Sequence, residues 1–391
     1  MPPTKSPRTV RVNGMPANHK RALDALARRG RLRALEPARG IDFSSNDYLG
    51  LAQSRELAAA VEAAIVRGVP VGAGGSRLLR GNHPEHEALE GEAAQFFGAE
   101  TALFFGGGFI ANTALMATLP ARGDVIVYDE LIHASAHDGM RLSKADSQAA
   151  RHNDPQSFED AIRGWRAVGG TGQPWIVVES LYSMDGDRAP IDDLAAIARS
   201  HDAMLIVDEA HATGVCGPDG RGLAAHLEGS PNVITLHTCG KALGVMGALV
   251  LAPRTVRDFL VNRARGFIYA TAPSPIVAAA VRAALGICRS QPERRAQLHR
   301  LIALAGSELG AKTRFVSSGS QIQPIIVGAD ASAVALAAAM KARGYDIRAI
   351  RPPAVPDGTA RLRLTITLNA EAAVLGQLIA DLAAAQAEIA A

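Results

Sequence analysis

The stretch AMLIVDEAHATG at residues 203–214 decides the fold class. Its apolar residues 204–207 form an unbroken run, which is typical of a strand that is buried on both faces of a sheet. Asp208 ends the run, and a carboxylate in such a place is costly to bury unless it pairs with a cation. The stretch therefore predicts a central strand that ends in a paired acidic side chain.

Further short runs of β-forming residues occur on both sides of this strand, and segments of helical length, such as 192–200, separate them. Alternation of strands and helices predicts an α/β fold, in which a mostly parallel sheet is covered by helices. The predicted strands are Thr101–Phe105, Asp124–Tyr128, Trp175–Glu179, Ala203–Asp208, Val233–His237 and Ala248–Leu251.

The pattern changes after a long helical region over 274–312. The shorter tail predicts strands at 323–326 and 361–367, a helix near 332–343 and a final Ala-rich helix. At the other end of the chain, leucines recur with helical spacing at Leu23, Leu26, Leu32 and Leu35. We therefore expect an N-terminal helical segment over 1–40, a large domain over 41–290 and a smaller α+β domain over 291–391.

Composition excludes several classes of protein. The 391 residues are 48% hydrophobic, which is enough for a core, and 41 basic side chains nearly balance 38 acidic ones. Aromatic residues make up only 4%, so a groove that stacks nucleic-acid bases is not expected. The three cysteines have no C-x-x-C spacing, which disfavours a disulfide framework or a thiolate zinc site.

Targeting signals are not expected either. The start, MPPTKSPRTVRVNG, carries positive charge but no apolar segment of the kind found in secretory signals. The longest apolar stretch, near 277–288, is interrupted by Arg282 and is too short to cross a membrane. We therefore expect a soluble, cytoplasmic protein that associates with neither membranes nor nucleic acids.

Glycine-rich segments could contact a phosphate. GAGGSR at 72–77 and GGGF at 106–109 do not match the dinucleotide-binding pattern G-x-G-x-x-G, and Gly240–Lys241 lacks the upstream glycine of a P-loop. GGGFIAN at 106–112 follows a predicted strand and precedes a helix, where bare backbone N–H groups can approach a phosphate. An ordinary strand-to-helix turn remains the alternative for this segment.

The stretch TCGKALG at 238–244 contains a candidate cation for Asp208. Lys241 follows another predicted strand, in a region with little other charge, and desolvation there would lower the pKa of its amine. A Schiff-base lysine and an acidic partner for a ring nitrogen are what pyridoxal phosphate requires. A purely structural ion pair between Asp208 and Lys241 is the alternative.

Two pairs of histidines have spacings that also occur in metal sites: His133 with His137, and His83 with His86. Neither pair carries the glutamate of H-E-x-x-H and no cysteine accompanies them, so we predict no metal site. His133 follows a predicted strand and should lie on the same rim of the sheet as Asp208, where its ring could stack on a flat cofactor. For His137 and His86 we expect ordinary surface positions.

Taken together, these motifs make the chain similar to the α-oxoamine synthase family of fold-type I pyridoxal-phosphate enzymes. The resemblance covers residues 20–385, and several of its motifs together are highly specific. The matching stretches are SSNDYLGL (44–51), GAGGSR (72–77), GGGFIAN (106–112), HAS (133–135), ESLYSMDGD (179–187), VDEAHATGVCGPDGRG (207–222) and TCGK (238–241).

The resemblance implies catalytic roles for Lys241, His133, Asp208 and His211. Lys241 would bind pyridoxal 5′-phosphate covalently and then move a proton. Asp208 would pair with the ring nitrogen, His211 would bond the 3-hydroxyl and His133 would stack on the ring. The other implied cofactor contacts are the backbone of Gly108 and Phe109, Ser183, the hydroxyl of Thr238, and Thr271 from the second subunit of a homodimer.

For the substrates, the resemblance implies that Asn46 and Arg363 bind an amino-acid carboxylate and that Arg33 and Arg351 contact the acyl substrate. The segment AIRPPAVPDGTARLRLT at 349–365 most resembles family members of biotin biosynthesis. These join L-alanine to a pimeloyl thioester, of CoA or acyl carrier protein, with loss of carbon dioxide. The alternatives are another α-oxoamine synthase, a fold-type I aminotransferase, or a protein that carries the cofactor without catalysis.

Overall fold

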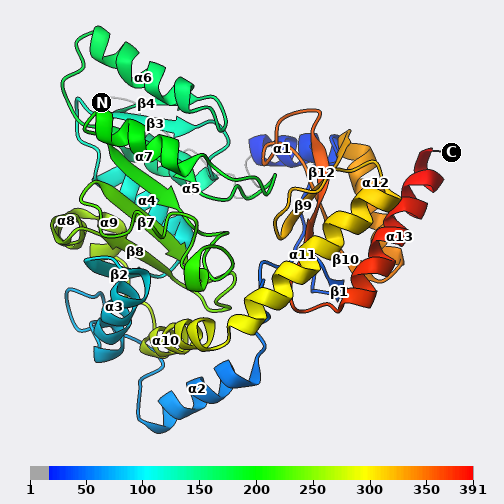
Figure 1. Ribbon diagram of the computed structural model, residues 1–391, viewed down its shortest axis with the longest axis horizontal. Coiled ribbons are helices and arrows are strands. Elements are labelled where there is room, and N and C mark those ends of the chain that lie inside the picture. The colour runs from blue at the N-terminus through cyan, green and yellow to red at the C-terminus, as the bar shows by residue number, and fades with distance from the viewer. Residues whose placement is uncertain (1–16, 391) are drawn as a thin grey trace, which may run out of the picture.

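The computed structural model describes residues 17–390, and its main feature is a seven-stranded sheet (Figure 1). The strands lie in the order β2-β8-β7-β6-β5-β3-β4. Neighbours run parallel except for β8, which is antiparallel to both β2 and β7. The strands are β2 (Thr101–Phe105), β3 (Val125–Asp129), β4 (Asp146–Ala150), β5 (Pro174–Glu179), β6 (Met204–Asp208), β7 (Val233–Thr238) and β8 (Ala248–Ala252).

Helices cover both faces of this sheet, because its strands are apolar on both sides (Figure 1). Ile126 faces one layer, and its neighbours Val125 and Val127 face the other, as the alternation of side chains in a strand requires. The first layer holds α4 (Gly108–Thr118), α5 (Ala134–Leu142), α8 (Arg254–Arg263) and α9 (Arg265–Ile268). The second holds α3 (Pro84–Phe97), α6 (Pro155–Ala167), α7 (Ile191–Ser200) and α10 (Pro275–Ser290).

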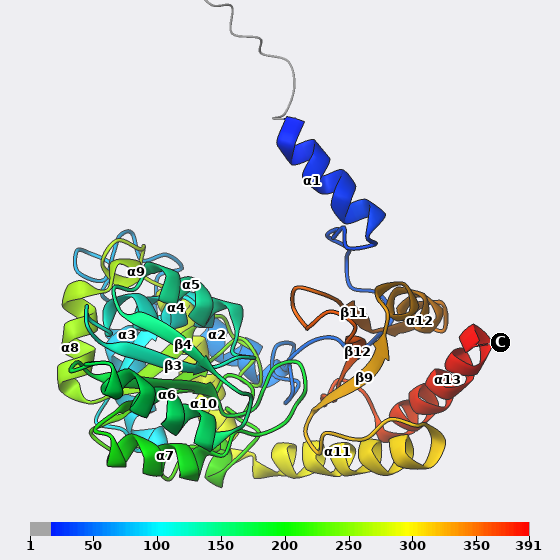
Figure 2. The same ribbon diagram turned by 90° about the horizontal axis from the view of Figure 1, so that it is seen from above.

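A second, smaller sheet lies beside the first and is reached through α11 (Pro292–Lys312), which follows α10 (Figures 1 and 2). It is antiparallel, in the order β11-β12-β9. The strands of this sheet are β9 (Ile322–Gly328), β11 (Arg348–Ile350) and β12 (Ala360–Thr365). The same part of the chain contains the helices α12 (Asp330–Ala342) and α13 (Ala372–Ala390).

Residues 41–43, at the start of the predicted large domain, pair with the C-terminal part of the chain and not with the large sheet. Strand β1 (Ile41–Asp42) pairs in parallel with β10 (Tyr345–Asp346), and the backbone N–H of Phe43 continues this contact to the carbonyl of Asp346. Helix α2 (Arg55–Val66), in contrast, packs against α10. The division of the chain near residue 290 remains a prediction.

The N-terminal helix is shorter than the leucine spacing predicts. Helix α1 (Ala17–Arg28) contains Leu23 and Leu26, but the prediction of helix through Leu32 and Leu35 is wrong. Gly30 adopts a left-handed φ of 63°, and the N–H of Arg31 returns to the carbonyl of Leu26 at 2.8 Å, which ends the helix. Helix α1 extends away from the rest of the molecule (Figure 2). Residues 1–16, including the segment tested for a secretory signal, lie outside the described residues.

The six strands predicted for the large sheet are confirmed, each to within one residue at either end. Strand β4 was not predicted. Its sequence, DSQAA, is polar and mostly exposed because it lies at the edge of the sheet, where it pairs only with β3. Such a strand carries no apolar pattern that the sequence could reveal.

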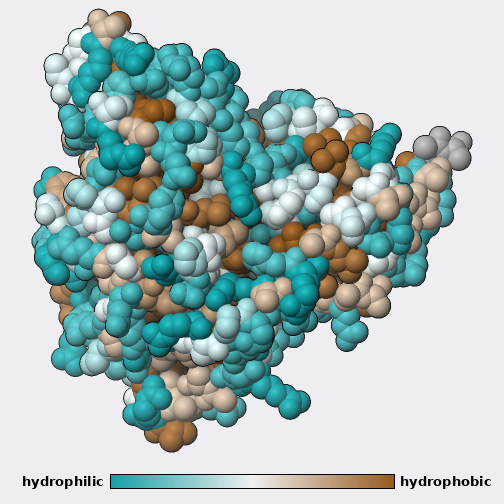
Figure 3. All heavy atoms as spheres, viewed as in Figure 1, coloured by the Kyte–Doolittle hydropathy of each residue, from teal (hydrophilic) through white to brown (hydrophobic). Residues whose placement is uncertain are grey.

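The buried interior is apolar, and the face drawn in Figure 3 is mostly hydrophilic, with hydrophobic residues in small patches. The three cysteines are buried and form no disulfide. By length and composition alone, one helix in residues 17–390 could cross a membrane, namely α13. It packs against α11 and α12 in this fold, with Leu378 and Ile379 wholly buried.

Candidate active site

Charged and polar side chains gather where the parallel strands end. Asp208 closes β6 and pairs in register with Glu179, which closes β5. Lys241 follows β7, the neighbour of β6 on the other side. The carboxyl ends of parallel strands lie at one edge of the sheet. Folds of this kind bind their ligands at that edge, at the point where the order of the strands reverses. Asp208, Glu179 and Lys241 therefore form one cluster.

The charge state of Lys241 is tuned by this cluster. Burial lowers the pKa of its amine to about 8, while the nearby carboxylates of Asp208 and Glu179 oppose the shift and Arg363 adds to it. An amine with such a pKa is partly neutral near physiological pH, and the neutral form is the nucleophile that attacks an aldehyde. The environment that the sequence predicts for Lys241 is the one that the structure provides.

Asp208 is held as an acceptor by its neighbours. It is buried, with one oxygen 2.6 Å from the amide Nδ2 of Asn112 and the other 2.9 Å from the backbone N–H of Ala210. The same amide of Asn112 also donates to the hydroxyl of Ser135 at 3.1 Å. These donors fix the orientation of the carboxylate and compensate for its burial.

Two histidines flank the cluster. His133 is exposed and caps α5, and its Nδ1 lies 2.8 Å from the hydroxyl of Ser135, which fixes the ring. His211 is buried, and its Nδ1 lies 2.5 Å from the hydroxyl of Tyr48. Burial and the positive charges of Lys241 and Arg363 hold the pKa of His211 well below its usual value. His211 is therefore neutral and keeps one N–H to donate.

A phosphate-sized group can approach the start of α4. Gly108 is the first residue of this helix, so its N–H and that of Phe109 have no partner within the helix. A Cβ at residue 108 would come 3.4 Å from the hydroxyl oxygen of Thr238, at the end of β7, so glycine keeps the space between them open. The site thus offers backbone donors, a hydroxyl and the positive end of a helix to an anion.

The C-terminal part contributes Arg363, from β12. Its Nε donates to the backbone carbonyl of Ser183 at 2.6 Å, and its Nη1 donates to Asn46 and to Thr365, both at 3.0 Å. Arg363 is buried and lies close enough to Lys241 to lower the pKa of that amine. The predicted residues Asn46, Ser183 and Arg363 are therefore brought together, although they are far apart in the sequence.

Arg33 and Arg351 lie together but apart from this cluster. With Arg31, Ala349, Ile350, Pro352 and Ala354 they line a small cavity of about 90 Å³. Ala354 also lines a neighbouring cavity of about 380 Å³, which extends past His133, Tyr182 and Val355. The guanidinium of Arg31 is paired with Asp330 and Asp357, whereas Arg33 makes no ion pair with any residue from 17 to 390.

Thr271 is exposed on this chain, close to the exposed ring of Tyr269. The next residue, Ala272, donates its N–H to the carbonyl of Gly75, so the segment is anchored to GAGGSR. Phe109 is also half-exposed, at the start of α4. Thr271 is therefore accessible to another molecule.

Three residues of the site were not singled out from the sequence: Glu179, Tyr48 and Asn112. Each lies inside a motif that was quoted, but only the fold shows what it touches. Burial and the charge of Asp208 raise the pKa of Glu179 to about 8, and its buried Oε1 has no hydrogen-bond partner within the described chain. An acidic side chain at the end of a predicted strand was the available signal.

The expectation of a surface position for His86 is wrong. His86 is wholly buried, with Nε2 2.7 Å from the carbonyl of Pro273, and its Nδ1 accepts the N–H of His83 in a helix cap. His137 is partly exposed against the ring of Tyr128. Within residues 17–390, no group of three or more potential ligands is arranged as a metal site would need.

Comparison with known proteins agrees with this geometry. The family model "Aminotransferase class I and II" matches residues 38–379. The 8-amino-7-oxononanoate synthase of Chromobacterium violaceum is 43% identical over 340 residues, 87% of each chain. The chain belongs to the class I and II aminotransferase family and, within it, to the 8-amino-7-oxononanoate synthases.

Solved structures are similar as well. A structure of SPT with PLP as the internal aldimine has a TM-score of 0.86 at 25% identity, over 95% of this chain and 98% of that one. The 8-amino-7-oxononanoate synthase of Francisella tularensis has a TM-score of 0.76 at 28% identity, over 90% and 99%. The predicted fold class, a fold-type I pyridoxal-phosphate transferase, is confirmed.

The protein is a pyridoxal-phosphate-dependent transferase, and its residues fit that cofactor. The start of α4 and Thr238 suit the phosphate, the oriented carboxylate of Asp208 suits a protonated ring nitrogen, and Lys241 suits the aldehyde. The exposed ring of His133 and the ring N–H of His211 lie at the same edge of the sheet as Asp208.

Proposed function

We propose that the protein catalyses the decarboxylative condensation of L-alanine with a pimeloyl thioester, of CoA or acyl carrier protein, as a cytoplasmic enzyme of biotin biosynthesis. The product would be 8-amino-7-oxononanoate, with carbon dioxide and a free thiol. The observation that carries the proposal is a buried lysine of lowered pKa, Lys241, with the buried guanidinium of Arg363 close enough to affect that pKa. The similarity to relatives that are named 8-amino-7-oxononanoate synthase supports this choice of substrates.

Each residue of the cluster has a task in this reaction. The cofactor, when bound, supplies an electron sink for the carbanion at Cα of the amino acid. Asp208 holds a proton on the ring nitrogen, and His211 donates a hydrogen bond to the 3-hydroxyl oxygen. The neutral amine of Lys241 removes the Cα proton and returns it after decarboxylation.

Arg363 orients the amino acid. Its guanidinium binds the carboxylate of alanine with charge-assisted hydrogen bonds, and Asn46 holds the guanidinium in place. Because Arg363 is fixed on three sides, the Cα–H bond of the bound amino acid is presented to Lys241 in one orientation.

The two cavities suit the acyl donor. The larger cavity lies between His133 and the segment 353–356. Its volume suits a short acyl chain, and so do the apolar side chains of Val355 and Pro356 that line it. The smaller cavity, with Arg33 and Arg351, suits the distal carboxylate of a dicarboxylic acyl group. A simple fatty acyl chain would leave these guanidinium groups without an anionic partner.

The central test compares pimeloyl and heptanoyl thioesters, which differ only in that carboxylate. With alanine, pimeloyl thioester should give free thiol and carbon dioxide faster than heptanoyl thioester, and also faster than acetyl, succinyl or palmitoyl thioesters, which differ in chain length. Arg351→Met should lower kcat/KM for pimeloyl thioester about 10- to 100-fold and leave the heptanoyl reaction unchanged. Arg348→Met, which removes an exposed arginine from β11, is the matched control.

Two outcomes would redirect the assignment. Preference for palmitoyl thioester with serine, or for acetyl thioester with glycine, would move the protein to a sister activity of the α-oxoamine synthases. Release of a keto acid from alanine without an acyl thioester would indicate an aminotransferase. Equal rates with pimeloyl and heptanoyl thioesters would refute the role of Arg33 and Arg351.

A further inference from the structure

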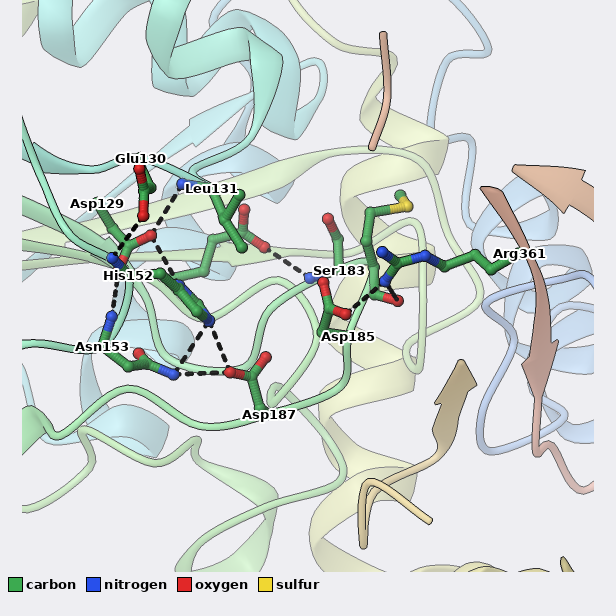
Figure 4. A network of polar contacts seen from close by, with 11 residues as sticks. Asp129, Glu130, Leu131, His152, Asn153, Ser183, Asp185, Asp187 and Arg361 are labelled. Atoms are coloured by element: carbon green, nitrogen blue, oxygen red, sulfur yellow. Dashed lines mark hydrogen bonds and ion pairs between the residues drawn. The ribbon is translucent and has the colours of Figure 1, made fainter. Parts of the chain in front are cut away.

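A loop at residues 181–188, which we call the bridging loop, joins the active site to the C-terminal part. At its base, the N–H of Ser183 donates to Glu179 at 3.1 Å, and the carbonyl of Ser183 accepts from Arg363 at 2.6 Å. At its tip, Asp185 pairs with Arg361, also from β12 (Figure 4). The position of this loop therefore sets where Arg363 lies relative to Lys241.

The far side of the bridging loop is held by a histidine outside the active site. His152 Nδ1 lies 2.9 Å from the carboxylate of Asp129, and its Nε2 lies 2.7 Å from that of Asp187, a residue of the loop (Figure 4). Asn153 reinforces both contacts, through its N–H to Asp129 at 2.9 Å and its amide to Asp187 at 2.7 Å. The ring packs edge-on against Tyr182.

This geometry favours a charged imidazole. The nearest partner of each ring nitrogen is a carboxylate oxygen, which only accepts hydrogen bonds, so both short contacts are satisfied when both nitrogens carry protons. The amide nitrogen of Asn153 lies farther from Nε2, at 3.2 Å, and donates to Asp187 at 2.7 Å. Asp129 is wholly buried at the end of β3, where an unpaired carboxylate would be strongly unfavourable. Despite partial burial, which lowers it, the pKa of His152 is raised to about 10 by Asp129 and Asp187. Glu130, whose carboxylate accepts the backbone N–H of His152, adds further negative charge.

We propose that His152 is a positioning residue that, as an imidazolium between Asp129 and Asp187, fixes the bridging loop against β12 and so places Arg363 for the substrate carboxylate. The inference rests on the proposed function through the role of Arg363. It assigns no contact between His152 and the substrate. Nothing in the reaction itself uses this imidazole.

We call the contacts of His152 with Asp129 and Asp187 the clamp. The first test measures directly whether the clamp holds the bridging loop. In the holoenzyme without substrate, His152→Gln should speed hydrogen–deuterium exchange at 181–188 and at 360–365 and leave the rest of the chain unchanged. His226→Gln is the matched control, because His226 pairs with Asp192 at 2.6 Å on the exposed surface, away from the site. Unchanged exchange at 181–188 would overturn the proposal, and so would a uniform increase along the chain.

The second test measures the consequence for catalysis. His152→Gln should raise KM for the amino acid about tenfold or more with a smaller change in kcat, because a displaced Arg363 weakens substrate positioning. The cofactor absorbance should persist. Asp187→Asn, which keeps the shape of the clamp, should show the same effect more weakly and serves if His152→Gln folds poorly. A fall in kcat with unchanged KM would contradict the proposal.

The pH dependence provides a third readout. Because the pKa of His152 is raised in the folded protein, its stabilising effect is fully present below the ordinary imidazole pKa of about 6.5. It is lost as the pH rises towards about 10. The gap in unfolding free energy between wild type and His152→Gln should therefore narrow from pH 6.5 to pH 10. A constant gap would show that the imidazole is not charged.

The two proposals can fail separately. Exchange at 181–188 is measured without substrate, so it reports on the clamp whatever the reaction is. If Arg363→Lys leaves KM for the amino acid unchanged, the role of Arg363 is wrong even if the clamp exists. If Arg363→Lys raises KM but His152→Gln does not, the clamp is wrong and the proposed function is unaffected.

Discussion

At the scale of single residues, burial and charge together set the chemistry of Lys241. Removing an ammonium group from water disfavours its charge, while Asp208 and Glu179 stop the shift at a pKa of about 8. The pKa of Glu179 moves in the opposite direction and rises to about 8, because its carboxyl group is buried beside Asp208. At neutral pH, Glu179 therefore favours its uncharged form more than an isolated glutamate would, and Lys241 is neutral to a larger extent than an isolated lysine.

The Lys241→Ala variant tests this assignment. It should fold but lose more than 99% of turnover, because no other lysine lies in the rim motifs. Wild-type protein should show a visible cofactor absorbance that borohydride bleaches and fixes to the chain, and the variant should not. Lys144→Ala, at an exposed lysine, is the control and should behave as wild type. Wild-type turnover by Lys241→Ala would refute the role of Lys241.

At the scale of elements, the bridging loop depends on one glycine. Gly186 has a φ of 70°, and a Cβ there would lie 2.3 Å from the carbonyl oxygen of Ile322 and 2.6 Å from the hydroxyl of Ser320. The loop can approach the start of β9 this closely only because residue 186 has no side chain. Its tip is therefore fixed by backbone contact as well as by the Asp185–Arg361 ion pair.

Gly186→Ala should consequently destabilise the protein by about 1–3 kcal/mol, from strain at positive φ and from the clash with β9. Denaturant unfolding followed by circular dichroism measures the difference. Gly164→Ala is the matched control, because Gly164 lies exposed in α6 with open space around it, and it should be neutral or stabilising by about 0.5–1 kcal/mol. Equal stability of the two variants would show that the loop does not need this close approach.

At the scale of the whole molecule, the phosphate site remains open on one chain. Thr271 and Tyr269 are exposed, and the side chain of Phe109 at the start of α4 is half-exposed. Apolar and hydroxyl side chains around a functional site suit a surface that a second subunit covers. We accordingly expect a homodimer in which Thr271 of each protomer reaches the cofactor phosphate of the other.

Hybrid dimers test this expectation. A dimer of one Lys241→Ala and one Thr271→Val protomer contains a single site with Lys241. If Thr271 acts across the interface, that site receives an intact threonine, and the hybrid should show about half of wild-type activity with wild-type cofactor affinity. If Thr271 acts within its own chain, the hybrid should instead show the weaker cofactor binding of Thr271→Val. A monomeric protein in light scattering would refute the arrangement altogether.

The sequence alone determined the α/β class, the six strands of the large sheet and the motif residues at their ends. These features are local, because an apolar run of strand length, or a lysine after a strand, can be read without knowing its partners. The same reasoning failed at Leu32 and Leu35, where Gly30 ends the helix, and at β4, whose polar edge carries no pattern.

Tertiary structure decided which of these residues meet. Arg363 reaches Ser183 and Asn46 only because β12 lies against the bridging loop, and the pKa of His152 is raised only because Asp129 and Asp187 flank its ring. The burial of His86 and the raised pKa of Glu179 likewise depend on contacts that are distant in sequence. Burial and Coulomb energies depend on distances in space, so spacing along the chain cannot supply them.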